Sequence, residues 1–127
     1  MNRKVLNKVV DISYNLLDLP NGRSRHFSFL VKRNNIVSMG WNKILKTHPI
    51  AFRYEHPYHK IHSELDCILN TKEENLSKLV MINVRIDMHN RLRISKPCNP
   101  CQNMLRDYGI KNVYFSTGVG FDLIILE

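Results

Sequence analysis

The sequence has few cysteines and no long apolar run. Three cysteines, Cys67, Cys98 and Cys101, are an odd number, which does not suit a disulfide framework and fits metal binding or catalysis in a reducing compartment. No apolar stretch approaches the ~20 residues that a bilayer-spanning helix needs. The basic N-terminal segment also lacks the apolar core and small-residue cleavage site of a secretory signal. The sequence therefore predicts a soluble, cytoplasmic protein.

The chain also lacks repeats, low-complexity tracts and breaks in composition. A sequence of 127 residues without such a break is expected to form one domain, residues 1–127. The 19 Lys and Arg residues outnumber the 11 Asp and Glu residues, and the net charge of +8 favours an anionic partner such as a nucleotide phosphate or a polynucleotide. Because no run of five like charges occurs, a solubilising surface explains the same charge equally well.

Segments typical of helices and strands alternate along the chain. Apolar residues recur at helical spacing over residues 5–17, and further helices are predicted at 63–69 and 100–108. Short β-rich runs predict strands at residues 27–31, 36–39, 79–86, 113–115 and 121–126, with a loop at 48–60. This alternation predicts an α/β fold with helices on both faces of one sheet.

Two short fragments carry the chemistry: His62-Ser63-Glu64 and Pro97-Cys98-Asn99-Pro100-Cys101. One imidazole and two thiolates are three ligands for a tetrahedral Zn²⁺, which leaves the fourth position for water, as in a catalytic zinc site. Each fragment opens a predicted helix, where free N–H groups favour thiolates. Positions 62 and 64 would point ~200° apart on a regular helix, so His62 must lie at the helix entrance. We expect both helix starts to converge on the metal.

Glu64 is the candidate catalytic residue, because a shell with three protein ligands and water has no place for it. Its expected role is to take a proton from water and deliver it to a ring nitrogen and then to the departing amine. H-x-E followed by P-C-x-x-C is the pattern of zinc deaminases that act on nucleobases. The sequence therefore predicts hydrolytic deamination, with cytosine as the expected base and ammonia as the second product.

Each fragment taken alone has another interpretation. A C-x-x-C pair is common in redox motifs and structural zinc sites, but a thioredoxin-like role leaves His62 and Glu64 unexplained. A closed, non-catalytic zinc module would use Cys67 as fourth ligand, although positions 62 and 67 lie ~140° apart around a helix. Cys67 is therefore expected in the core, and Glu64 argues against the non-catalytic module.

The sequence resembles the cytidine and deoxycytidylate deaminase superfamily over residues 27–115. Runs similar to those of compact viral and bacterial members are G-x-N-K, T-H-P, S-K-P-C-x-x-C-Q and G-I-K-x-V-Y-x-S-T, which begin here at Gly40, Thr47, Ser95 and Gly109. The resemblance implies bound Zn²⁺, a three-layer α/β/α fold around a mixed five-stranded sheet, and a homo-oligomer. It also implies that Asn42 contacts the substrate sugar, with capping of local backbone as the alternative.

Two features of the sequence resemble different subfamilies. The first metal ligand is His62, as in deoxycytidylate and tRNA-adenosine deaminases, whereas cytidine deaminases commonly have a cysteine there. The link at residues 116–120 is far shorter than the dozen or more residues of a parallel crossover, so the last strand is predicted to be antiparallel, as in cytidine deaminases. A groove-forming helix between the last strands is then missing, and the pocket is expected to be open.

Further candidates for substrate contact are less specific. Arg25, together with Arg23 and His26, precedes the first predicted strand, where a phosphate could lie, and solvated charge is the alternative. Phe27 is a candidate for stacking on the base, with a core position as the alternative. Ser63, within the His62-Ser63-Glu64 fragment, is a further candidate for substrate contact. Weaker candidates for phosphate binding are Arg85 and Lys96.

The loop before His62 is rich in aromatic and histidine residues. His48, His56 and His59 are candidates for substrate contact or for a second, regulatory zinc, with an ordinary surface loop as the alternative. These features leave two activities open. The first is deamination of a free cytosine nucleoside or nucleotide, supported by Asn42 and the compact chain. The alternative is deamination of cytosine or adenine in single-stranded nucleic acid or tRNA, supported by the net charge and the loop aromatics.

Overall fold

The computed structural model describes residues 1–20, 24–54 and 60–127, so the expectations for Arg23, His56 and His59 lie outside the described residues. The elements in chain order are α1 (Arg3–Tyr14), β1 (Arg25–Lys32), β2 (Asn35–Trp41), β3 (Lys43–Thr47), α2 (Pro49–Arg53), β4 (Lys60–Ile61), α3 (Ser63–Asn70), β5 (Val80–Ile86), β6 (Leu92–Arg93), α4 (Asn99–Asp107), β7 (Asn112–Ser116) and β8 (Phe121–Ile125). Within these described ranges, no helix is long and apolar enough to cross a membrane.

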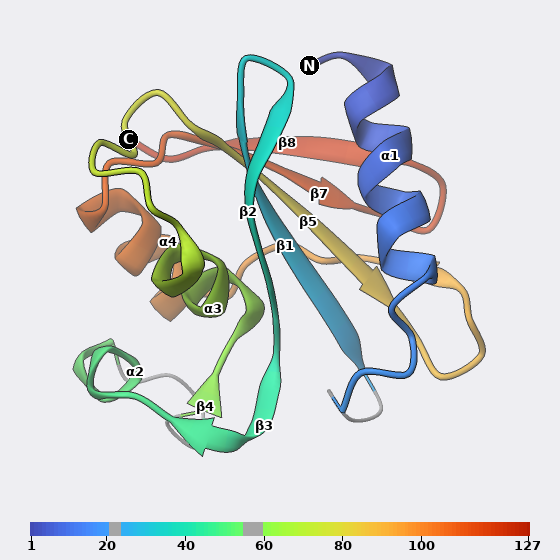
Figure 1. Cartoon of the computed structure of the whole chain (residues 1–127), viewed down its shortest axis with the longest axis horizontal. Helices are drawn as coiled ribbons and strands as arrows, with labels where there is room; N and C mark the ends of the chain where they lie inside the picture. The colour runs from blue at the N-terminus through green and yellow to red at the C-terminus, as the bar shows by residue number, and fades with distance from the viewer. Residues whose placement is uncertain (21–23, 55–59) are drawn as a thin grey trace.

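A mixed sheet forms the centre of the molecule, with strand order β2-β1-β5-β7-β8 and with β6 paired to the end of β5. Strands β5 and β7 are parallel, and β7 and β8 are antiparallel, which confirms the prediction for the last strand. Helix α1 covers one face of the sheet, and α3 and α4 cover the other (Figure 1). The three-layer α/β/α fold is therefore confirmed, with six strands rather than five because β6 adds a two-residue strand.

The side chains of β1 and β5 alternate between the two faces of the sheet. Phe27 and Phe29 face α1, where they pack in one core cluster with Val5 and Val9. On the opposite face, the cross-strand pairs become more polar along the strands. The first pair is the core pair Leu30 and Met81, the next is the polar pair Ser28 and Asn83, and the last is His26 and Arg85. The sheet is thus apolar under the middle of the α3–α4 layer and polar toward the start of α3.

Strand β2 lies directly against α3. The backbone of Trp41 donates to the Asp66 carboxylate at 3.0 Å, and Lys43 pairs with the same oxygen at 3.2 Å. The Lys43 ammonium also lies over the Trp41 ring. Both ionic side chains are largely buried, so this contact fixes α3 on the strand that carries the G-x-N run.

The segment predicted as a loop at residues 48–60 contains elements that the sequence did not predict. Pro49 opens the short helix α2, and His48 caps it by accepting a hydrogen bond from the backbone of Ile50 at 3.1 Å. Strands β3 and β4 form a separate two-stranded sheet. A helix of five residues and a strand of two residues are too short to show a hydrophobic period.

Candidate active site

The two motif fragments meet at the N-termini of α3 and α4. His62 is the N-cap residue of α3 and Cys98 that of α4, each with an extended backbone, ψ 161° and 165°, and neither side chain caps its own helix. N-cap side chains usually accept a hydrogen bond from the first N–H groups of their helix, and these two side chains make no such bond. His62 Nδ1 lies instead 3.7 Å from Cys98 Sγ and 3.3 Å from Cys101 Sγ.

These three side chains have the donors and spacing of a metal site. Their ligand atoms all lie within 4.8 Å of one another. Around a tetrahedral Zn²⁺, a nitrogen and a sulfur ligand are separated by about 3.5 Å, given bond lengths of about 2.0 and 2.3 Å. The two observed nitrogen–sulfur distances bracket that value. The residues therefore fit a metal ion with borderline-soft N and S preference, as the sequence motifs predicted.

Cys67 is separate from this group. It is fully buried in the core cluster between the sheet and the α3–α4 layer, and burial raises the pKa of its thiol to about 12. Among the described residues, the group that could hold a metal ion contains His62, Cys98 and Cys101 and does not include Cys67. The closed structural site with Cys67 as fourth ligand is therefore not what the structure forms, and the core position expected for Cys67 is observed.

The thiols of Cys98 and Cys101 have pKa values shifted in opposite directions. Hydrogen bonding from the Cys101 thiol, with a further contribution from His62, lowers the pKa of Cys98 to about 4, whereas the pKa of Cys101 is raised. The hydrogen bond to Cys98 raises the pKa of His62. Cys98 is therefore a thiolate at neutral pH, ready to bind a cation. A divalent ion would displace the remaining protons, because metal ligands must be deprotonated.

Glu64 lies in the first turn of α3, where the residue is 6% exposed. Oε2 accepts a hydrogen bond from Asn83 Nδ2 at 3.1 Å, and Oε1 lies 3.2 Å from the Ser63 hydroxyl. Burial raises the pKa of the carboxyl group. Because burial disfavours the charged form of this carboxyl group, it accepts a proton more readily than an exposed glutamate does, which suits the proton-transfer role predicted for Glu64.

The predicted substrate contacts Asn42 and Ser63 both make hydrogen bonds within the protein, and Ser63 follows the candidate ligand His62 directly in the sequence. Asn42 Oδ1 accepts from the His26 backbone and its Nδ2 donates to the Ser24 carbonyl, both at 3.0 Å, so the amide holds the start of β1. The Ser63 hydroxyl is buried and lies 2.8 Å from the Ser28 hydroxyl, pointing toward the sheet. Both side chains have a structural role here, which is the alternative weighed for Asn42.

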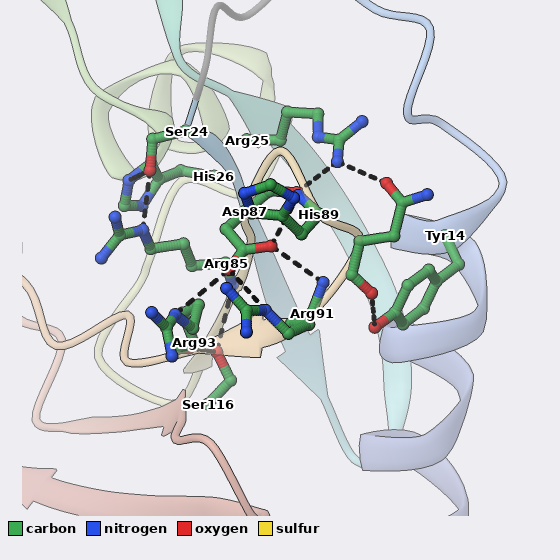
Figure 2. Close-up of polar contacts among 11 residues, drawn as sticks. Tyr14, Ser24, Arg25, His26, Arg85, Asp87, His89, Arg91, Arg93 and Ser116 are labelled. Carbon is green, nitrogen blue, oxygen red and sulfur yellow. Dashed lines mark hydrogen bonds and ion pairs between the residues drawn. The ribbon is translucent and has the colours of Figure 1, made fainter.

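Phe27 and Arg25 are not brought to this site. Phe27 is fully buried on the α1 face of the sheet, so its ring has no free surface for a base. Arg25 lies on the same face by strand alternation, and its Nη2 donates to the Asp87 carbonyl and to Asn90 Oδ1. Figure 2 shows these two contacts of the Arg25 guanidinium, and the hydroxyl of Tyr14 of α1 donates to the Asn90 carbonyl on the same side of the sheet. Because a side chain on this face is separated from α3 by the sheet, neither residue is kept as a substrate contact.

The residues on the other face of the same strand ends do approach the site. His26 Nε2 lies 3.1 Å from Ser24 Oγ, and Arg85 Nε donates to that oxygen at 2.7 Å (Figure 2). Burial, with the nearby charges of Arg85 and His62, lowers the pKa of His26 to about 4, so the ring is neutral. Sequence reasoning did not single out Ser24 or Asn83. A signal for Asn83 was present, since a lone amide between apolar residues of a buried strand needs a partner.

Comparison with known proteins rests on structure alone. No protein-family model and no curated protein matches the sequence. The dCMP deaminase of cyanophage S-TIM5 in apo form matches with a TM-score of 0.60 at 17% identity, over 89% of this chain and 82% of that one. The same enzyme with dCMP and dUMP gives a TM-score of 0.59 at 16% identity, over 89% and 81%. Cytidine deaminase from Mycobacterium leprae gives 0.53 at 13% identity, over 97% and 93%. The chain therefore has the fold of the cytidine and deoxycytidylate deaminase superfamily.

Proposed function

We propose that this protein is a zinc-dependent hydrolase that converts the cytosine of a free nucleoside or nucleotide to uracil, with release of ammonia. One observation carries the proposal: His62, Cys98 and Cys101 present three ligand atoms within 4.8 Å of one another, beside the buried carboxyl group of Glu64. This donor set and spacing fit Zn²⁺ with an open fourth position. The deaminases with the same fold support the assignment of the reaction.

In this proposal, His62, Cys98 and Cys101 would hold Zn²⁺, which would supply the Lewis acidity that makes water a nucleophile at neutral pH. Glu64 would accept one proton from the attacking water and pass it to the ring nitrogen, and would then move the second proton of that water to the amine. The C–O bond forms when the water attacks, and the C–N bond breaks when ammonia leaves. Water and cytosine thereby give uracil and ammonia. We propose that Asn42, whose amide orders the start of β1, also contacts the sugar.

We propose that the preferred substrate is a monophosphate such as dCMP. Arg85 is half-buried on the site face, next to His26, and no carboxylate lies within ion-pair distance of it among the residues that the structure describes. Its charge is therefore available to a phosphate. A short turn links β7 and β8, without a helix that could extend a strand-binding groove. A neighbour of the same fold was crystallised with dCMP and dUMP.

The test is ammonia release from cytidine, deoxycytidine, dCMP and a cytosine-containing single strand at ~0.15 M salt. We expect dCMP to have the highest kcat/KM. Arg85→Gln should raise the KM for dCMP at least tenfold and leave deoxycytidine unaffected, because only dCMP carries the phosphate. Arg91→Gln is the matched control, since Arg91 is exposed and paired with Asp87. A single strand that outperforms dCMP tenfold would instead assign the enzyme to polynucleotide editing.

We also propose that the chain forms at least a dimer. Strand β8 is the last strand on one side of the sheet, and its Leu123 and Ile125 are 44% and 60% exposed. Apolar side chains on an open strand edge favour contact with another chain. Light scattering after size exclusion should give at least twice the mass of 15.0 kDa, and a plain monomer would contradict the proposal.

A further inference from the structure

A buried polar network lies beneath Glu64, between α3 and the sheet. Its members Ser28, Ser63 and Asn83 are 0%, 2% and 3% exposed. Buried polar groups cost stability unless they are hydrogen-bonded, and apolar residues would fill the same face of β1 and β5 without that cost. The network is connected to one ionisable group, Glu64, through two of its members.

The hydrogen bonds of Asn83 fix the orientation of its amide. Nδ2 faces two acceptors, Glu64 Oε2 at 3.1 Å and the Ser95 carbonyl at 3.3 Å, while Oδ1 faces the Ser28 hydroxyl at 2.7 Å. If the amide were flipped, its oxygen would face the Glu64 carboxyl oxygen and the Ser95 carbonyl oxygen, and no N–H donor would lie between these acceptors. Both N–H groups of Asn83 are therefore used, one of them on Glu64.

The two serine hydroxyls between Asn83 and Glu64 allow two consistent arrangements of hydrogens. The single hydrogen of the Ser28 hydroxyl can be donated to Asn83 Oδ1 at 2.7 Å or to Ser63 Oγ at 2.8 Å, while the Ser63 hydroxyl donates to Glu64 Oε1 at 3.2 Å. The donation from Asn83 to Oε2 is the same in both arrangements. The contact from Asn83 to Glu64 therefore does not depend on how the serine hydroxyls are rotated.

We propose that Asn83 is a positioning residue that holds the carboxyl group of Glu64 in one rotation for proton transfer. The inference rests on the proposed deaminase function. Asn83 lies at the centre of β5, paired with Ser28 on β1 and with Phe115 on β7, so its own position is set by the sheet. Through the Ser95 carbonyl, the same amide contacts the segment that leads to Cys98. One side chain therefore connects the general acid–base residue to the chain that supplies two metal ligands.

Two variants and a matched control test this role. Asn83→Leu keeps the approximate volume and removes both donors, and Asn83→Asp keeps the shape and can donate only while the new carboxyl group is protonated. Ser28→Ala is the control, because it removes the neighbouring hydroxyl and leaves the contact from Asn83 to Glu64 intact. Zinc content, Tm, KM and kcat for the best substrate, and the crystal structure of Asn83→Leu are measured.

We expect Asn83→Leu to bind stoichiometric zinc with KM within about threefold of the parent and kcat lowered about 10²-fold, as for a catalytic group displaced by about 1 Å. Its crystal structure should show a rotated Glu64 carboxyl group. Asn83→Asp should recover part of its kcat at pH 6 relative to pH 8, because protonation restores a donor. Ser28→Ala should stay within about fivefold of the parent.

A folded, zinc-loaded Asn83→Leu with kcat within threefold of the parent would overturn the inference. If Asn83→Leu does not fold, Asn83→Asp decides: loss of zinc together with activity, and no recovery at pH 6, would assign Asn83 to the scaffold alone. Failure of the proposed function has a different signature, since the parent itself would then release no ammonia from any substrate.

Discussion

At the residue scale, Glu64 is the group whose chemistry is easiest to isolate. Glu64→Gln keeps the volume of the side chain and can still accept a hydrogen bond from Asn83, so the fold and the three metal ligands should be unaffected. Because a glutamine cannot take up the proton, we expect kcat to fall by roughly 10² to 10⁴. Ammonia release checks the activity, and elemental analysis should still find one zinc per chain. Near-normal turnover by the variant would refute the role of Glu64.

The three cysteines provide a comparison within one chain. Cys98→Ala and Cys101→Ala each remove one ligand atom of the metal-binding group, so both variants should lose zinc and show a lower Tm. Cys67→Ala is the control, because Cys67 is buried in the core outside that group. It should retain stoichiometric zinc while losing some stability to the smaller side chain. The prediction fails if Cys98→Ala or Cys101→Ala retains stoichiometric zinc.

At the scale of elements, Gly40 determines how closely β2 approaches α3. A Cβ atom at this position would lie 2.3 Å from the Cys67 backbone nitrogen and 2.7 Å from the Asp66 carbonyl carbon. We expect Gly40→Ala to push the helix away from the strand and to lower the free energy of unfolding by about 1–3 kcal/mol. Because α3 carries Glu64, kcat should fall as well. Urea denaturation and ammonia release measure the two effects.

Gly118→Ala is the matched control for Gly40→Ala. Gly118 lies in the turn between β7 and β8, where an added Cβ meets nothing within 4 Å. Its stability should therefore stay within about 0.5 kcal/mol of the parent, as for most surface substitutions. Equal effects at the two glycines would show that the contact between β2 and α3 is not responsible.

The elements also show what the sequence could and could not predict. The helices that begin after His62 and Cys98 were predictable because each motif sits at the start of an apolar periodic segment, and the link at residues 116–120 was too short for any connection but a hairpin. Helix α2 and strands β3, β4 and β6 were missed because their pairing depends on tertiary contacts and their lengths carry no period.

The candidate site was predictable only in its motif residues. His62, Glu64, Cys98 and Cys101 follow a fixed spacing, and the structure brings them together. Arg25 and Phe27 were placed at the site by their proximity in sequence to the first strand, but strand alternation turns both to the α1 face. Which face of a strand meets the site depends on where α3 docks, and that information lies outside the strand itself.

At the scale of the whole molecule, the candidate metal site brings together two parts of the chain that are distant in sequence. Helices α3 and α4 lie on the same face of the sheet, opposite α1, and a bound ion would link their first residues (Figure 1). Removing zinc with a chelator should therefore lower the Tm. When free zinc is 100 times its Kd, the lost stabilisation is about 2.7 kcal/mol.

The loss should also be local. Helix α1 packs on the opposite face with the Phe27 and Phe29 cluster, which contains none of the metal ligands. We therefore expect hydrogen exchange after chelation to accelerate at the first turns of α3 and α4 more than in α1, because local opening follows the contacts that are removed. Lower pH should also release the ion and accelerate exchange at these helix starts, since His62 and the cysteines must lose protons to bind the ion. Zinc content measured from pH 8 to pH 5 should fall, and readdition of zinc at pH 8 should restore Tm and exchange protection together. Equal acceleration in α1, or a Tm that does not respond to zinc, would show that the ion does not hold the two helices in place.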